Sequence, residues 1–240
     1  MKYYAYCVAR REIPEVNRPG IENQILENLQ FDDVITVVVS KFAGDIVQVT
    51  RPNVLAHEAV VRAVMSFSTP LPFRFGTLVS EVGLRNFVES RRPSLLARLD
   101  AIQNCVEMSV KIIWPNLPDD SSEGAPVLGN MGAGTAFLRN KKLELLGNER
   151  LHDEAEEIRG WLSNGLKGKV RQEFVTVEPR SKIVVSGAFL IEKLTENEFK
   201  NSVKLLQESR PELHFLTSGP WPPYTFANID LEFETQFRVS

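Results

Sequence analysis

The segment Gly219-Pro220-Trp221-Pro222-Pro223-Tyr224-Thr225-Phe226 constrains the backbone more than any other stretch of this 240-residue chain. Each of its three prolines fixes φ near −65° and favours extended geometry in the residue before it. We therefore expect residues 219–240 to begin as a stiff arm that is neither a helix nor a central strand.

Three aromatic side chains, Trp221, Tyr224 and Phe226, are carried by this arm. Large aromatic side chains gain free energy when they leave water and lose little rotamer entropy on burial. Two interpretations stand: the arm is a strap on the protein's own core, or it is a preformed anchor for a partner. We expect the strap for Trp221 and leave Tyr224 and Phe226 open.

A second proline-rich stretch, residues 69–77, contains Arg74. Its extended geometry predicts that Leu71, Phe73 and Phe75 point to one side and Arg74 to the other. Arg74 then either pairs with a carboxylate or helix-end carbonyls of its own chain, or donates two hydrogen bonds to a partner's carboxylate.

The second half of the chain has a regular order of elements. Alternating apolar residues predict strands, and apolar residues at three- and four-residue steps predict helices. The predicted strands are 107–114, 170–177, 182–191 and one from 214, and the predicted helices are 134–167, with a possible break near Gly147, and one capped by Thr195 and Glu198.

This order is β-α-β-β-α-β, which is typical of a ferredoxin-like domain with an antiparallel sheet and both helices on one face. We expect an α+β protein of two domains: residues 1–104, and residues 105–240 with a long loop at 115–132. That loop is rich in Pro, Ser, Gly and Asp, which fits a mobile loop or an interdomain linker.

The first half predicts an α+β domain whose topology the sequence leaves unspecified. Strands are expected at 2–8 and 33–39 and a helix at 54–66. Two further helices, 80–90 and 93–104, are expected to meet at Arg91-Arg92-Pro93.

Composition excludes several classes of partner. The net charge of −3 gives no basic surface for nucleic acid or anionic lipid. The longest apolar run, Val34–Val39, is interrupted by Thr36 and is far shorter than the ~20 residues of a membrane-spanning helix. Cys7 and Cys105 are the only cysteines and form no CxxC motif, which fits a cytoplasmic protein without disulfides.

No catalytic, metal or cofactor motif is complete. His57-Glu58 begins like the zinc motif HExxH, but Val61 stands where the second histidine is needed. His57 shares an apolar helix face with Val54, Val61 and Val64, which favours a packing role. We therefore expect no catalytic residue, no metal, no cofactor and no enzyme activity.

GPWPPYTF resembles the C-terminal signature of the gas vesicle protein F/L family (GvpF/GvpL). Further stretches resemble the family in the same order: Tyr4–Val8, Val37–Ser40, His57–Val61, Leu71–Thr77, Glu107–Lys111 and Gly134–Arg139, where the family more often has Tyr at position 137. Segment 115–132 resembles no part of the family.

The resemblance implies a minor structural or accessory protein of gas vesicle assembly, located in the cytoplasm and at the vesicle. Its implied partners are the hydrophobic major shell protein and other gas vesicle proteins, with no nucleic acid and no membrane. The alternative is a small-molecule-binding or enzymatic module, because ferredoxin-like domains have many functions. An exposed apolar patch favours assembly, and a deep polar pocket favours the alternative.

Overall fold

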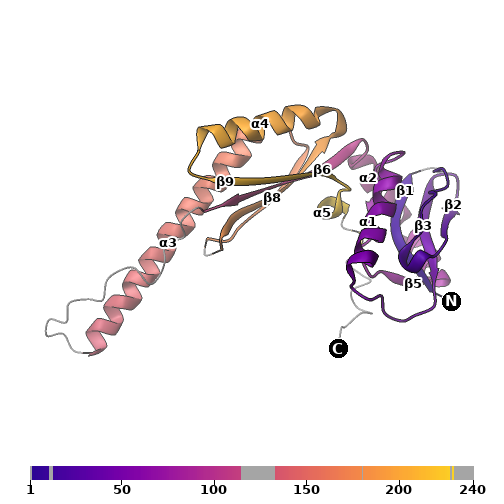
Figure 1. Cartoon of the computed structure of the whole chain (residues 1–240), viewed down its shortest axis with the longest axis horizontal. Helices are drawn as coiled ribbons and strands as arrows, with labels where there is room; N and C mark the ends of the chain where they lie inside the picture. Colours follow the sequence, from indigo (N-terminus) through magenta and orange to yellow (C-terminus); the bar gives the residue numbers. More distant parts are fainter. Residues whose placement is uncertain (1, 11–12, 115–132, 180, 228, 230–240) are drawn as a thin grey trace. The chain divides into compact units, whose positions relative to one another are not determined.

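The computed structural model describes residues 2–10, 13–114, 133–179, 181–227 and 229, with 133–148 as backbone only (Figure 1). It divides into two units, one made of residues up to Glu107 together with the described residues from Gly219 onward, and one made of Met108–Ser218. The predicted domains 1–104 and 105–240 differ from these units in where they assign residues 105–107 and the residues from Gly219 onward. The predicted loop 115–132 lies outside the described residues.

The first unit is built on an antiparallel sheet with strand order β2-β3-β1-β4, and β5 also pairs with β1. Its elements in chain order are β1 (Lys2–Arg10), the 3-10 turn η1 (Ile21–Asn23), β2 (Leu26–Phe31), β3 (Ile35–Phe42), α1 (Arg51–Met65), β4 (Leu71–Pro72), β5 (Leu78–Ser80), α2 (Glu81–Ala101) and the short helix α5 (Tyr224–Ala227). The predicted strands at 2–8 and 33–39 correspond to β1 and β3, and β2 was not predicted.

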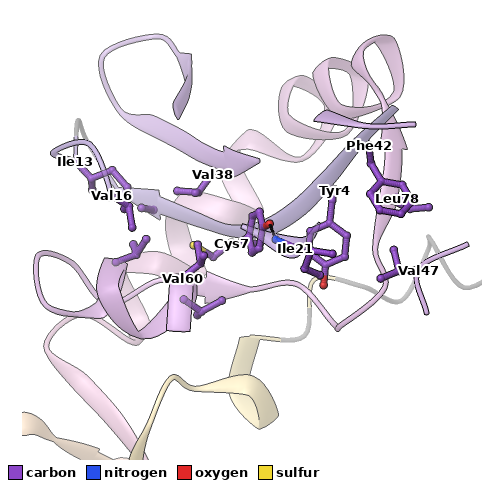
Figure 2. Close-up of a cluster of buried hydrophobic side chains, with 14 residues drawn as sticks. Tyr4, Cys7, Ile13, Val16, Ile21, Val38, Phe42, Val47, Val60 and Leu78 are labelled. Carbon is purple, nitrogen blue, oxygen red and sulfur yellow. Dashed lines mark hydrogen bonds between the residues drawn. The ribbon is translucent and has the colours of Figure 1, made fainter. Parts of the chain in front are cut away.

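The core of this unit is centred on β1. Neighbouring residues of a strand point to opposite faces of the sheet, and all residues from Tyr4 to Ala9 are fully buried. Both faces of the sheet are therefore covered, and both α1 and α2 pack against β1. Figure 2 shows the apolar cluster that joins β1 to α1, in which Cys7 lies close to Val60.

The predicted helix at 54–66 is confirmed as α1. It begins three residues earlier because Thr50 is its N-cap: the Thr50 hydroxyl accepts a hydrogen bond from the Asn53 N–H at 3.4 Å. His57, Val60, Val61 and Val64 are its buried residues, spaced as one helix face.

The prediction of two helices meeting at Pro93 is wrong, because α2 is continuous through this residue. Pro93 is exposed, and the buried residues Leu84 and Val88 before it lie on the same helix face as Leu95 and Leu99 after it. Burial of this continuous apolar face outweighs the hydrogen bond that the proline cannot donate.

The second unit contains most of β6 (Cys105–Ile113), then α3 (Ala133–Leu166), β7 (Gln172–Val177), β8 (Ile183–Glu192), the 3-10 turn η2 (Lys193–Thr195), α4 (Glu196–Ser209) and most of β9 (His214–Trp221). Its sheet has the strand order β7-β8-β6-β9. Each element predicted for this half is present, and α3 continues through Gly147. The capping box is absent: the Thr195 hydroxyl donates to the Glu192 carbonyl at 3.0 Å, because Thr195 closes η2.

The helices α3 and α4 pack against each other and against β8. A Cβ at Gly165 of α3 would lie 2.5 Å from Cδ2 of Leu206 of α4, so the missing side chain permits this close approach. Phe189 of β8 contacts Phe199 of α4, with ring centroids 5.7 Å apart. Phe174 pairs with Ala188, one residue out of phase with Phe189, and so lies on the opposite face, where its side chain is exposed.

Candidate functional site

The segment from Gly219 to Ala227 lies on the first unit and forms the candidate site. Trp221 is partly buried, and the guanidinium carbon of Arg62 on α1 lies 5.0 Å from the centroid of its ring. The Nε of Arg62 donates a hydrogen bond to the carboxylate of Glu58, one helical turn earlier, and this contact holds Arg62 in place. A cation over an indole face is attracted by the negative π surface, so α1 and the segment are joined at Trp221.

The segment makes two hydrogen bonds with the side chain of Glu107. Its Oε2 accepts the backbone N–H of Thr225 and its Oε1 accepts the Thr225 hydroxyl, both at 2.8 Å. Glu107 is buried, and desolvation raises the pKa of its carboxyl, while the two hydrogen bonds from Thr225 lower it. Two donors on two acceptor oxygens fit an ionised carboxylate, which has no proton to donate.

The expectation that the arm is nowhere helical is wrong for its last residues. Tyr224–Ala227 form the turn of helix α5, closed by the Ala227 N–H donating to the Pro223 carbonyl at 2.9 Å. Proline restricts the residue before it and is well suited to the start of a helix, where its missing N–H has no intrahelical partner. The Ala227 carbonyl accepts a hydrogen bond from Nη1 of Arg98 at 3.0 Å, so α5 is bound at both ends.

A buried group of polar and aromatic side chains surrounds His57. The Tyr4 hydroxyl lies 2.7 Å from Nδ1 of His57 and accepts the Gly76 N–H at 3.2 Å. The ring of Tyr6 stacks on the imidazole, with ring centroids 5.7 Å apart. The ring centroid of Tyr224 lies 6.2 Å from that of His57; Tyr224 belongs to Gly219–Ala227, which we call the docked segment. His57 therefore connects the core of the first unit to the segment.

Burial lowers the pKa of His57 to about 4, with the Phe73 carbonyl acting in the opposite direction. The imidazole is thus neutral at pH 7. Because Gly76 donates to Tyr4, the Tyr4 hydroxyl can donate to Nδ1, which leaves the imidazole proton on Nε2. Nε2 makes no hydrogen bond of normal geometry within the described residues. These features fit a packing histidine.

The four residues predicted as candidates lie in two places. Trp221, Tyr224 and Phe226 belong to the docked segment, where Tyr224 keeps 36% of its surface exposed and Phe226 is partly buried. Arg74 lies in the turn between β4 and β5, with its side chain exposed and its carbonyl accepting the Thr77 hydroxyl at 2.8 Å.

The residues that hold the segment were not predicted from the sequence: Arg62, Arg98 and Glu107. Glu107 had a visible signal, since it is a single acid in the otherwise uncharged start of strand β6, Cys105–Val110. A buried acid predicts a hydrogen-bond partner, although nothing local predicts that the partner is Thr225.

A group of exposed aliphatic side chains lies before and at the start of α1. Ile46 and Val49 are 76% and 81% exposed, and Val54 and Leu55 are also exposed; we call these four residues the aliphatic group. The Thr50 N–H donates to the Gln48 carbonyl at 2.9 Å, and the Asn53 side chain donates to the same carbonyl at 3.0 Å. This tight turn has Val49 at its corner and holds it out into solvent.

No cluster of three or more His, Cys, Asp or Glu side chains in the described part of the chain is arranged to hold a metal ion. Among the helices that the structure describes, none has the length and apolar character needed to span a membrane.

Solved structures share this fold. The crystal structure of the gas vesicle protein GvpF from Anabaena sp. matches with a TM-score of 0.77 at 23% identity, covering 95% of this chain and 98% of that chain. GvpF from Microcystis aeruginosa matches with a TM-score of 0.74 at 20% identity, covering 95% and 99%. The fold, with its helices and two antiparallel sheets, is therefore that of GvpF structures.

Sequence comparison extends this to the family. The profile of the gas vesicle synthesis protein GvpL/GvpF family matches residues 2–228. Gas vesicle protein L2 of Halobacterium salinarum is 26% identical over 93% of this chain and 90% of its own length. Gas vesicle protein L of a Streptomyces species is 24% identical over 97% and 96%. The chain belongs to the GvpL/GvpF family of gas vesicle proteins, which is not known as an enzyme family.

Proposed function

We propose that this chain is an accessory protein of gas vesicle assembly that acts in the cytoplasm and at the vesicle, and binds the hydrophobic major shell protein and other gas vesicle proteins. Family membership supports the connection to gas vesicles. A shell that holds gas and excludes liquid water needs apolar surface, and such surface aggregates before assembly unless it is covered.

The aliphatic group is the observation that carries this proposal. Four large aliphatic side chains within residues 46–55 are exposed, and covering one of them fully contributes about 1.5–3 kcal/mol. Leu55, Glu58 and Arg62 are spaced along one side of α1, and Arg62 contacts Trp221. The proposed contact surface therefore runs from the aliphatic group to the docked segment.

Trp221 and Tyr224 belong to this proposed surface, since both keep part of their area exposed. Partly exposed Trp, Tyr and Arg side chains are the residue types enriched in binding hot spots. Phe226 and Arg74 remain further candidates for contact with the partner.

Co-purification with the major shell protein tests the proposal. The triple variant Ile46→Ser, Val49→Ser, Leu55→Ser should capture about tenfold less shell protein than the parent, because it removes apolar contact area. The control Phe174→Ser, Leu216→Ser removes two comparably exposed side chains of the second unit and should capture the parental amount. Parental capture by the triple variant contradicts the proposed surface.

We also infer that the second unit is a ferredoxin-like domain. The element order β6-α3-β7-β8-α4-β9 and the strand order β7-β8-β6-β9 support this assignment. The boundaries of this domain then lie near residues 107 and 218, where the chain passes from one unit to the other.

A further inference from the structure

The docked segment is fixed mainly by directional polar contacts at the two ends of α5. At the start of α5, both oxygens of the Glu107 carboxylate are hydrogen bonded to Thr225, and at the end Arg98 donates to the Ala227 carbonyl. Hydrogen bonds to a charged group stabilise the folded state more than hydrogen bonds between neutral groups do. A buried carboxylate without hydrogen-bond donors strongly destabilises the folded state.

Apolar burial contributes less to this attachment. Thr225 is exposed, Tyr224 keeps 36% of its surface in water, and Phe226 is only partly buried. The buried apolar residues between Gly219 and Ala227 are small or cyclic, namely Pro222, Pro223 and Ala227, and the one large buried aliphatic residue described after them is Ile229. A segment with little apolar burial and a few strong polar contacts can open without unfolding the core beneath it.

We propose that residues 222–227 form a detachable strap, which leaves and rebinds the rest of the first unit as one piece. The carboxylate of Glu107 is the group that holds this strap in its bound position. Opening exposes the surface under α5, including β4, against which α5 packs. This inference rests on contacts within the first unit and is independent of the proposed role in assembly.

Amide hydrogen exchange on the full-length protein tests the strap. In Glu107→Gln the carboxylate is lost without a change of shape, and in Thr225→Val the hydroxyl is lost while the backbone N–H stays. In each variant the amide hydrogens of residues 224–227 should exchange about tenfold faster than in the parent. Peptides from β1 and α1 should keep the parental rates, because the core stays folded.

Thr217→Val is the matched control, since Thr217 is also an exposed threonine, in the middle of β9, and should leave exchange at 224–227 unchanged. The double variant Glu107→Gln, Thr225→Val should exchange hardly faster than the faster single variant, because both changes remove the same contact. Parental exchange at 224–227 in both single variants overturns the proposal. So does an equal acceleration across β1 and α1, or a double variant whose effect is the product of the two single effects.

Discussion

His57 and Glu107 are two of the buried ionisable residues next to the docked segment, and burial favours the neutral form of each. For His57 the pKa falls from 6.5 to about 4. The unfolded chain therefore takes up a proton below about pH 6.5, while the folded chain does so only near pH 4. Stability from this residue is complete at pH 7 and is lost as the pH falls through that window.

We predict that the free energy of unfolding decreases by roughly 3 kcal/mol between pH 7 and pH 4 on account of His57, since one pKa unit corresponds to about 1.4 kcal/mol. Urea melts across this range measure it. His57→Phe should lack this part of the pH dependence, whatever its stability at pH 7. The same substitution at the exposed His214 serves as control, and a parental slope in His57→Phe would show that the histidine does not titrate as described.

Trp221 provides the second residue-scale prediction. Replacing a fully buried aromatic residue by Ala costs about 3–5 kcal/mol, and Trp221 is partly buried with Arg62 over its ring. We expect Trp221→Ala to lower the free energy of unfolding by about 2 kcal/mol and Tyr224→Ala to lower it less. An unchanged urea midpoint for Trp221→Ala would refute the interpretation that Trp221 is docked on the protein's own core.

Among the elements, sequence reasoning succeeded where local periodicity coincides with burial. The helix α4 and the strand β8 carry buried apolar residues at the spacing of their own geometry, so their assignment needed no distant contact. The strand β2, with sequence LENLQF, has no β-branched residue and was missed. Pro93 predicted a helix end because local propensity does not include the apolar face that continues through α2.

Pro93 gives a prediction at this scale. Pro93→Ala restores a backbone N–H at an exposed position inside a helix, and proline there is about 3 kcal/mol less favourable than alanine. We expect the free energy of unfolding to rise by about 1–3 kcal/mol in urea melts. The neighbouring exposed substitution Ser94→Ala should change it by less than about 0.5 kcal/mol, and a lower midpoint for Pro93→Ala would mean that the proline itself stabilises α2.

Two glycines of α3 form a matched pair. A Cβ at Gly165 would meet Leu206, whereas a Cβ at Gly160 has nothing within 4 Å. Gly160→Ala should therefore stabilise the protein by about 0.5–1 kcal/mol, because alanine restricts the unfolded chain. Gly165→Ala should be about 1–2 kcal/mol less stable than Gly160→Ala, because Leu206 must move. Equal thermal midpoints would contradict the close approach of α3 and α4.

At the scale of the whole molecule, the order of helices and strands in the second half of the chain could be predicted from the sequence. Which residues belong to the first unit could not. Glu107 and Thr225 are separated by 118 positions and yet share two hydrogen bonds. No periodic pattern spans such a distance, so the sequence suggested an arm on the second domain. The candidate aromatic residues could be recognised in the sequence because they are large aromatic residues in a proline-rich stretch. Arg62, Arg98 and Glu107 could be recognised as their partners only from the fold.

The first unit is therefore incomplete without its C-terminal part. A fragment of residues 1–114 should melt at a lower temperature than the first unit does in the full chain, because Glu107 loses its donors from Thr225. Addition of a synthetic peptide of residues 219–229 should raise that midpoint as the peptide concentration increases. A Thr225→Val peptide is the control, and an equal effect of both peptides would show that the Glu107 contact contributes little.

The two crossings of the chain, near residues 107 and 218, also determine the order in which the protein is completed on the ribosome. Synthesis delivers about 5–20 residues per second, so Glu107 emerges several seconds before Thr225. The second unit has all of its residues once Ser218 has emerged, whereas the first unit still lacks α5. The part of the protein that is translated first is thus the last to reach its final structure.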